Sequence, residues 1–202
     1  MTVTDANACQ ITRTVTVGQP AAALAGTATK TDVSCFNGNN GTATVAVTGG
    51  TPGYTYSWAP SGGTAATATG LSARTYTVTV TDANACQITR TVTVGQPAAA
   101  LTGTATKTDV SCFNGSNGTA TVVASGGTGP YTYSWAPSGG TAATASGLAA
   151  GTYIVTVKDA NNCQITRTVT VGQPAAALAG TITKTDVSCF NGSNGTATVV
   201  AS

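Results

Sequence analysis

The sequence predicts an all-β protein made of tandem sandwich repeats, and three observations support this fold class. Thr, Ala, Gly and Val dominate the 202 residues, whereas strong helix formers are scarce. Short stretches alternate apolar with polar residues and are separated by Gly, Asn and Pro. A block of 77 residues also recurs, and two series of cysteines mark its period: Cys9, Cys86 and Cys163, and Cys35, Cys112 and Cys189.

The period divides the chain into four segments. The two complete repeats are residues 22–98 and 99–175. The end of another repeat precedes them at 1–21, and the start of a further repeat follows them at 176–202. The complete repeats differ at only 13 of 77 positions. Met1 stands where the first complete repeat has Val78, so we expect the chain to be an excerpt of a longer linear array.

Each repeat is expected to contain six strands separated by turns. In the first repeat they are Thr27–Cys35, Thr42–Thr48, Tyr54–Trp58, Thr64–Leu71, Tyr76–Thr81 and Gln87–Val94. Alternation of apolar with polar residues indicates the second, third, fifth and sixth of these and is strict in Tyr54–Trp58, while Thr64–Leu71 is weak. Arg90 breaks the pattern because it falls on the inward face; a bulge, or a stem reaching over the sandwich edge, would explain it.

The aromatic side chains are expected to form the core. Tyr54, Tyr56 and Trp58 alternate with small polar residues, so the three rings share one face of their strand. The second repeat has the same pattern at Tyr131, Tyr133 and Trp135. Stacking of these rings on sugar is the alternative, but their alternation with Thr and Ser favours core packing.

A further tyrosine predicts an immunoglobulin-like sandwich. Tyr76 and Tyr153 each open a strand directly after a turn, as in a tyrosine corner, where the hydroxyl bonds to backbone a few residues upstream. The turn contains Arg74 in the first repeat and Gly151 in the second. Since glycine suits turns better, we expect the corner of the first repeat to be more strained or differently shaped.

Composition excludes several functions. Only 7% of residues are charged, and the chain has neither His nor Glu, so the commonest general bases and metal ligands are missing and we expect no enzyme. A net charge of +2 offers no field for nucleic acid. No apolar run is long enough for a membrane helix, so we expect no membrane insertion.

The cysteines predict disulfides and an extracellular location. Their spacing lacks the close pairs of a zinc site, and no base is present to activate a thiol. With six strands, the first and fifth turns lie at one end of the sandwich, which favours Cys35–Cys86 and Cys112–Cys163 and leaves Cys9 and Cys189 single; a seventh strand would remove this preference. The rival pairing is Cys9–Cys35, Cys86–Cys112 and Cys163–Cys189, which joins neighbouring repeats.

No cofactor is expected, although calcium remains an open alternative. Asp32 and Asp82 would approach each other if the first and fifth turns share an end, and carbonyls of residues 37–41 lie nearby in sequence. Two carboxylates are few for an ion that takes six to eight oxygens, and ordinary capping of turns explains both residues.

Several motifs together resemble the SprB-type repeat: Asp109–Gly115, Gly126–Thr128, Tyr131–Trp135, Gly147–Tyr153 and Lys158–Cys163. This resemblance implies an immunoglobulin-like fold in very large cell-surface adhesins of gliding Bacteroidota, which the type IX secretion system exports. It supplies no catalytic residues. Arg74 departs from the glycine that the pattern has at this position.

Two roles are therefore expected, with neighbouring repeats as the principal partners. The repeats form the shaft of a long surface filament, or they are multivalent modules that bind polysaccharide weakly and gain avidity from number. The truncated ends raise a third possibility, in which strands of neighbouring chains complete each other's sandwiches.

Overall fold

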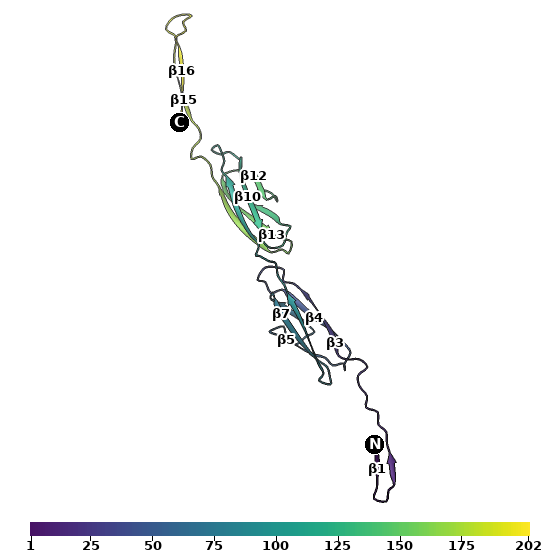
Figure 1. Cartoon of the computed structure of the whole chain (residues 1–202). Coiled ribbons are helices and arrows are strands. Elements are labelled where there is room, and N and C mark those ends of the chain that lie inside the picture. The colour runs from purple at the N-terminus through teal and green to yellow at the C-terminus, as the bar shows by residue number, and fades with distance from the viewer. The chain divides into compact units, whose positions relative to one another are not determined.

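The computed structural model describes residues 1–202 and contains strands but no helix (Figure 1). The all-β prediction is confirmed. Two compact units are present: one comprises Met1–Val33 and Asn37–Gln96, and the other comprises Ser34–Phe36 and Pro97–Ser202. No helix in the structure is long and apolar enough to cross a membrane.

The first complete repeat folds into two three-stranded antiparallel sheets. Its strands are β3 (Ala25–Thr31), β4 (Gly41–Thr48), β5 (Thr55–Ala59), β6 (Thr67–Leu71), β7 (Arg74–Thr81) and β8 (Gln87–Val94). The sheet orders are β3-β4-β6 and β5-β7-β8. Side chains from both sheets meet in one buried cluster, so the sheets form a sandwich.

The second complete repeat has the same sheets. Its strands are β9 (Thr102–Thr108), β10 (Gly118–Ser125), β11 (Thr132–Ala136), β12 (Thr144–Leu148), β13 (Gly151–Lys158) and β14 (Gln164–Val171). The flanking segments are hairpins: β1 (Thr2–Thr4) pairs with β2 (Gln10–Thr12), and β15 (Gly180–Thr185) with β16 (Thr196–Ala201). Their side chains are exposed, because no second sheet covers them.

The predicted aromatic core is present, and the tryptophan is the most buried of the three alternating rings. Trp58 is 5% exposed, and its indole N–H donates to the carbonyl of Ala65 at 2.9 Å. Tyr54 and Tyr56 pack against the same cluster but are only half-buried. In the second repeat Trp135 is buried, while Tyr131 and Tyr133 are half-buried.

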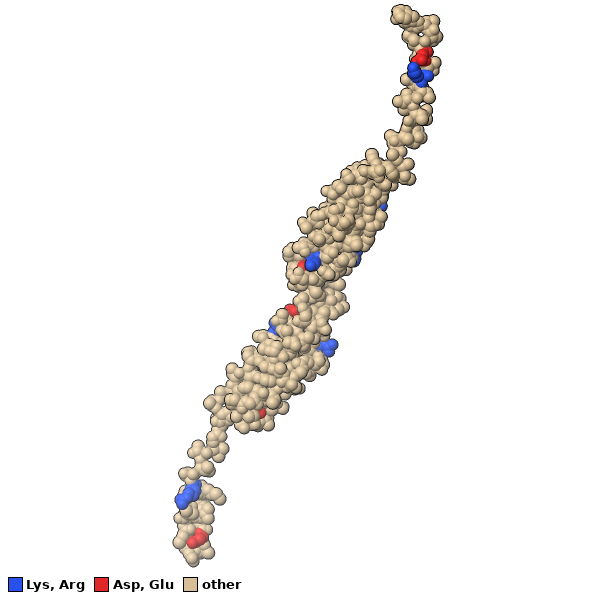
Figure 2. Space-filling model, turned by 180° about the vertical axis from the view of Figure 1, so that it is seen from behind, with Lys and Arg blue, Asp and Glu red and all other residues tan.

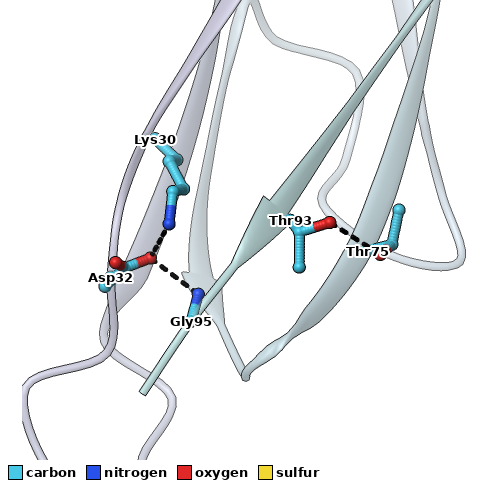
Figure 3. A network of polar contacts seen from close by, with 5 residues as sticks. All are labelled: Lys30, Asp32, Thr75, Thr93 and Gly95. Atoms are coloured by element: carbon cyan, nitrogen blue, oxygen red, sulfur yellow. Dashed lines mark hydrogen bonds and ion pairs between the residues drawn. The ribbon is translucent and has the colours of Figure 1, made fainter. Parts of the chain in front are cut away.

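One side of the sandwich is closed by contacts between β3 and β8. The register of β8 on β7 is continuous, so Arg90 sits in no bulge; its Nε donates to the carbonyl of Gly26 at 2.6 Å. Its stem therefore reaches across the edge between the sheets. At the far end of these strands, Asp32 accepts hydrogen bonds from Lys30 Nζ and the Gly95 N–H, both at 2.6 Å (Figure 3).

Both tyrosine corners are confirmed. The hydroxyls of Tyr76 and Tyr153 donate to backbone carbonyls four residues upstream, each at 3.1 Å. The expected difference between the corners is wrong, because Arg74 and Gly151 both lie in strand register and neither has a positive φ. The left-handed position is instead Gly147 in the second repeat, with φ of 67°.

Glycine is therefore required at 147 and dispensable at 151. We expect Gly147→Ala to lower the free energy of unfolding of the second repeat by about 1–2 kcal/mol, the cost of a left-handed L-residue. Arg74→Gly should lower that of the first repeat by about 0.5–1 kcal/mol, since glycine weakens strands. Urea titrations of both variants measure this, and stabilisation by Arg74→Gly would contradict it.

Candidate functional site

The turn between β13 and β14 is organised by a buried carboxylate. Asp159 is 4% exposed, and its Oδ1 accepts hydrogen bonds from the N–H groups of Asn161 and Cys163, both at 2.9 Å. Its Oδ2 accepts from the Thr128 N–H at 3.0 Å. One side chain thus fixes both the turn that carries Cys163 and the neighbouring loop after β10.

The first repeat has the same arrangement, in which a buried aspartate accepts backbone hydrogen bonds from a turn and a neighbouring loop. Asp82 accepts from the N–H groups of Thr51, Asn84 and Cys86, all at 2.9 Å. The bond from Thr51 is the main cause that holds the pKa of Asp82 below its usual value; the bonds from Cys86 and Asn84 act in the same direction, and burial opposes them.

Acid should therefore destabilise the first repeat. A lowered folded-state pKa means that the carboxylate contributes stability above its ordinary pKa of about 3.9 and loses it as pH falls through the folded value. With Trp135→Phe, Trp58 becomes the sole tryptophan, and its fluorescence reports the urea midpoint of this repeat. We expect this urea midpoint to decrease when the pH is lowered below about 4.

Asp82→Asn should lower the urea midpoint of the first repeat at pH 7. It should also make that midpoint less dependent on pH in acid. Asp32 also has a lowered pKa, mainly through its hydrogen bond to Lys30, but that ion pair is half-exposed. About 1 M NaCl should screen its contribution and leave that of Asp82. An Asp82→Asn variant with the parent's pH dependence would contradict the assignment.

The turn between β13 and β14 of the second repeat binds a loop of the first repeat, namely the loop that follows β3. Cys35 forms a disulfide with Cys163, with Cα atoms 5.8 Å apart, and both residues lie in the second compact unit. Asn161 Nδ2 donates to the carbonyl of Ser34 at 3.0 Å. Phe36 lies beside the bond, and only about 140 Å³ of cavity remains. We call the residues that receive the loop the socket: Ala100, Leu101, Gly127, Asp159, Cys163, Gln164 and Ile165.

The loop is also held by a hydrogen bond to a residue of its own repeat. The N–H of Asn37 donates to Gln96 Oε1 at 2.7 Å, and Asn37 has a positive φ of 58°. The second repeat repeats this contact between Asn114 and Gln173 at 2.9 Å. Neither Phe36 nor Gln96 was predicted as a site residue, although both recur with the period of the repeat: the phenylalanine directly after a loop cysteine, and the glutamine within the repeated Gly-Gln-Pro-Ala-Ala-Ala-Leu segment.

The structure corrects the predicted cysteine pairing. Neither Cys35–Cys86 nor Cys112–Cys163 forms, and the rival pairing is absent as well; the other four cysteines are free and exposed, namely Cys9, Cys86, Cys112 and Cys189. The strand registers place Cys35 and Cys86 at opposite ends of the first repeat. The expectation assumed simple reversals, but β5 and β6 run in the same direction, because residues 60–66 turn back between them.

The same geometry removes the calcium hypothesis in its predicted form. Asp32 lies at the end of the sandwich where β8 finishes, whereas Asp82 lies at the end where β8 begins. Each carboxylate is occupied by donors of the protein itself. No three carboxylate or thiol side chains converge on a common point in the structure.

Charge is sparse on the surface as well. Lys, Arg and Asp side chains are few and scattered over the visible face (Figure 2). Three of the lysines are already paired with an aspartate two residues along the chain: Lys30 with Asp32, Lys107 with Asp109 and Lys184 with Asp186. Because charged side chains are so few, the socket and the free cysteine thiols are the chemically distinctive features of this molecule.

Disulfide-linked sandwiches in tandem are typical of secreted and cell-surface repeat proteins. Comparison with known families supports this class: the SprB repeat family matches residues 27–63 and 104–141. Each complete repeat thus contains one match to the SprB repeat, a family found in cell-surface proteins. A search of curated proteins found no match.

Proposed function

We propose that these repeats form the shaft of a long secreted bacterial filament that serves surface attachment and gliding, with export by type IX secretion. The observation that carries the proposal is the Cys35–Cys163 disulfide, which spans 128 residues of sequence and joins a loop of one repeat to the socket of the next. Such a bond suits a load-bearing role. It contributes no chemistry of its own, and we propose no enzymatic role.

Covalent connectivity explains how the bond would serve a shaft. Force applied at the chain ends can pass from β3 through Cys35 and Cys163 into β14, without loading the backbone of residues 36–162. The sheets in that interval are then protected from extension even if their hydrogen bonds open. A longer array stapled at each socket would gain length without gaining extensibility.

The adhesive alternative has less support. Sugar-binding platforms present exposed aromatic rings, whereas Trp58 and Trp135 are buried and the tyrosines pack against the core. The exposed rings are the phenylalanines of the cysteine loops, and Phe36 already lies in the loop that the socket receives. These observations favour a shaft over a ligand-binding module.

A glycan array tests the choice between the two roles. The oxidised chain, displayed in many copies on beads to amplify weak contacts, should bind no glycan above the level of unrelated sandwich domains. Selective binding to one class of polysaccharide, lost when the beads carry chemically unfolded chain, would contradict the shaft and support the adhesive module.

A further inference from the structure

The first repeat has the same socket in an open state. A cavity of about 490 Å³ surrounds Cys86, and the residues that line it include Leu24, Gly50, Asp82 and Ile88. Each of these residues stands 77 positions before a residue of the occupied socket. There the cavity is reduced to about 140 Å³ around Cys35 and Phe36. The open cavity therefore has the same kinds of lining residue as the socket that holds the Cys-Phe loop, and it is larger.

The segment beside the open cavity also matches. Residues 18–24 have the same sequence as residues 95–101, and Gln19–Leu24 already lines the cavity. In the occupied case the equivalent Gln96 accepts the hydrogen bond that fixes the loop at Asn37. A loop entering the cavity at Cys86 would therefore meet an acceptor at Gln19.

The loop between β15 and β16 is the corresponding unpaired plug. Ser188–Asn191 has the same sequence as Ser34–Asn37, and Asn191 has the same left-handed conformation, with φ of 59°. Cys189 is a free thiol, and Phe190 is 96% exposed, against 37% for Phe36. The loop is thus preformed but lacks the apolar contacts that its counterpart makes.

The other free thiols fit less well. The loop at Cys112 is partly covered, because Phe113 is 37% exposed and lines a cavity with Pro174 and Leu178, and Gln173 accepts a hydrogen bond from the Asn114 N–H. Cys9 occupies the turn between β1 and β2 and has no phenylalanine after it. Only Cys189 combines a free thiol with an unpacked aromatic neighbour.

We propose that the open socket of one chain binds the Ser188–Asn191 loop of a second copy, and that a Cys86–Cys189 disulfide locks the contact. Oxidised glutathione serves as the oxidant. A cysteine thiolate attacks it and releases one reduced glutathione; the second thiolate then attacks the mixed disulfide and releases another. Two thiols and one oxidised glutathione thus give one protein disulfide and two reduced glutathiones.

Such a contact joins unlike surfaces, so it extends chains head to tail without closing a symmetric dimer. It concerns copies of this chain in solution and stands apart from the proposed role at the cell surface. If the crosslink does not form, the proposed shaft role is unaffected. If the chain binds a glycan, the proposed crosslink is unaffected.

The test uses the full chain with Cys9→Ser and Cys112→Ser, incubated in a glutathione redox buffer. We expect a ladder of dimers and longer species on non-reducing gels, with a Cys86–Cys189 peptide in the mass spectrum. Adding Cys86→Ser or Cys189→Ser should abolish the ladder. Mixing these two variants should restore a dimer that grows no further, and Cys35–Cys163 in every sample verifies the fold.

Phe190→Ala separates docking from chance collision of exposed thiols. If the ring seats in the socket, the initial rate of crosslinking should fall about tenfold or more, because burial of a phenylalanine contributes much of the contact. An unchanged rate would overturn the proposal. So would persistent monomer, a Cys86–Cys189 bond within one chain, or symmetric Cys189–Cys189 dimers.

Discussion

Pulling the oxidised chain from its two ends should release about 440 Å less contour length than pulling the reduced chain. The Cys35–Cys163 bond encloses 128 residues of sequence, and each extended residue contributes about 3.4 Å. Both sandwiches can lose their structure under load, but the enclosed backbone cannot lengthen while the bond is intact. Single-molecule force spectroscopy measures the difference directly.

Two variants control this experiment. Cys35→Ser and Cys163→Ser should each give the long extension even without reductant, whereas Cys86→Ser should keep the short one, because that thiol takes no part in the staple. Equal extensions of the oxidised and reduced chains would contradict the load path described for the shaft.

Trp58→Ala should lower the free energy of unfolding of the first repeat by about 3–5 kcal/mol, the usual cost of deleting a buried aromatic ring. The loss combines a cavity between the sheets with the unpaired carbonyl of Ala65. Hydrogen exchange read by mass spectrometry should show amides of β7 exchanging about a hundredfold faster or more.

The second repeat supplies the matched control. Because each sandwich has its own buried cluster, amides of β13 should retain their protection in Trp58→Ala and lose it in Trp135→Ala. Trp58→Phe should be milder, since a ring still fills most of the space. Equal loss of protection in both repeats would show that they do not unfold independently.

The sequence was sufficient for those features that depend on local pattern. Alternation placed Trp58 inward, and a tyrosine after a turn predicted the corner at Tyr76, because both depend on neighbours a few residues away. Arg90 showed the limit of this reasoning. Its parity was read correctly, but only the structure shows that its stem reaches Gly26 across the edge of the sandwich.

The cysteine pairing failed for a reason of topology. The weak strand was expected at Thr64–Leu71, yet β6 begins only at Thr67, and residues 60–66 turn the chain back between β5 and β6. That additional reversal moves Cys86 to the opposite end from Cys35. Alternation carries no information on such a crossing, and it cannot show that a loop finds its partner in the next repeat.

Non-reducing peptide mapping of the oxidised chain tests the central claim most directly. If the loop after β3 fills the socket of the following repeat, proteolysis should yield one dominant crosslinked peptide pair containing Cys35 and Cys163, which separates on reduction. Pairs joining Cys35 to Cys86 or to Cys9 would show that the staple lies elsewhere and would contradict the account.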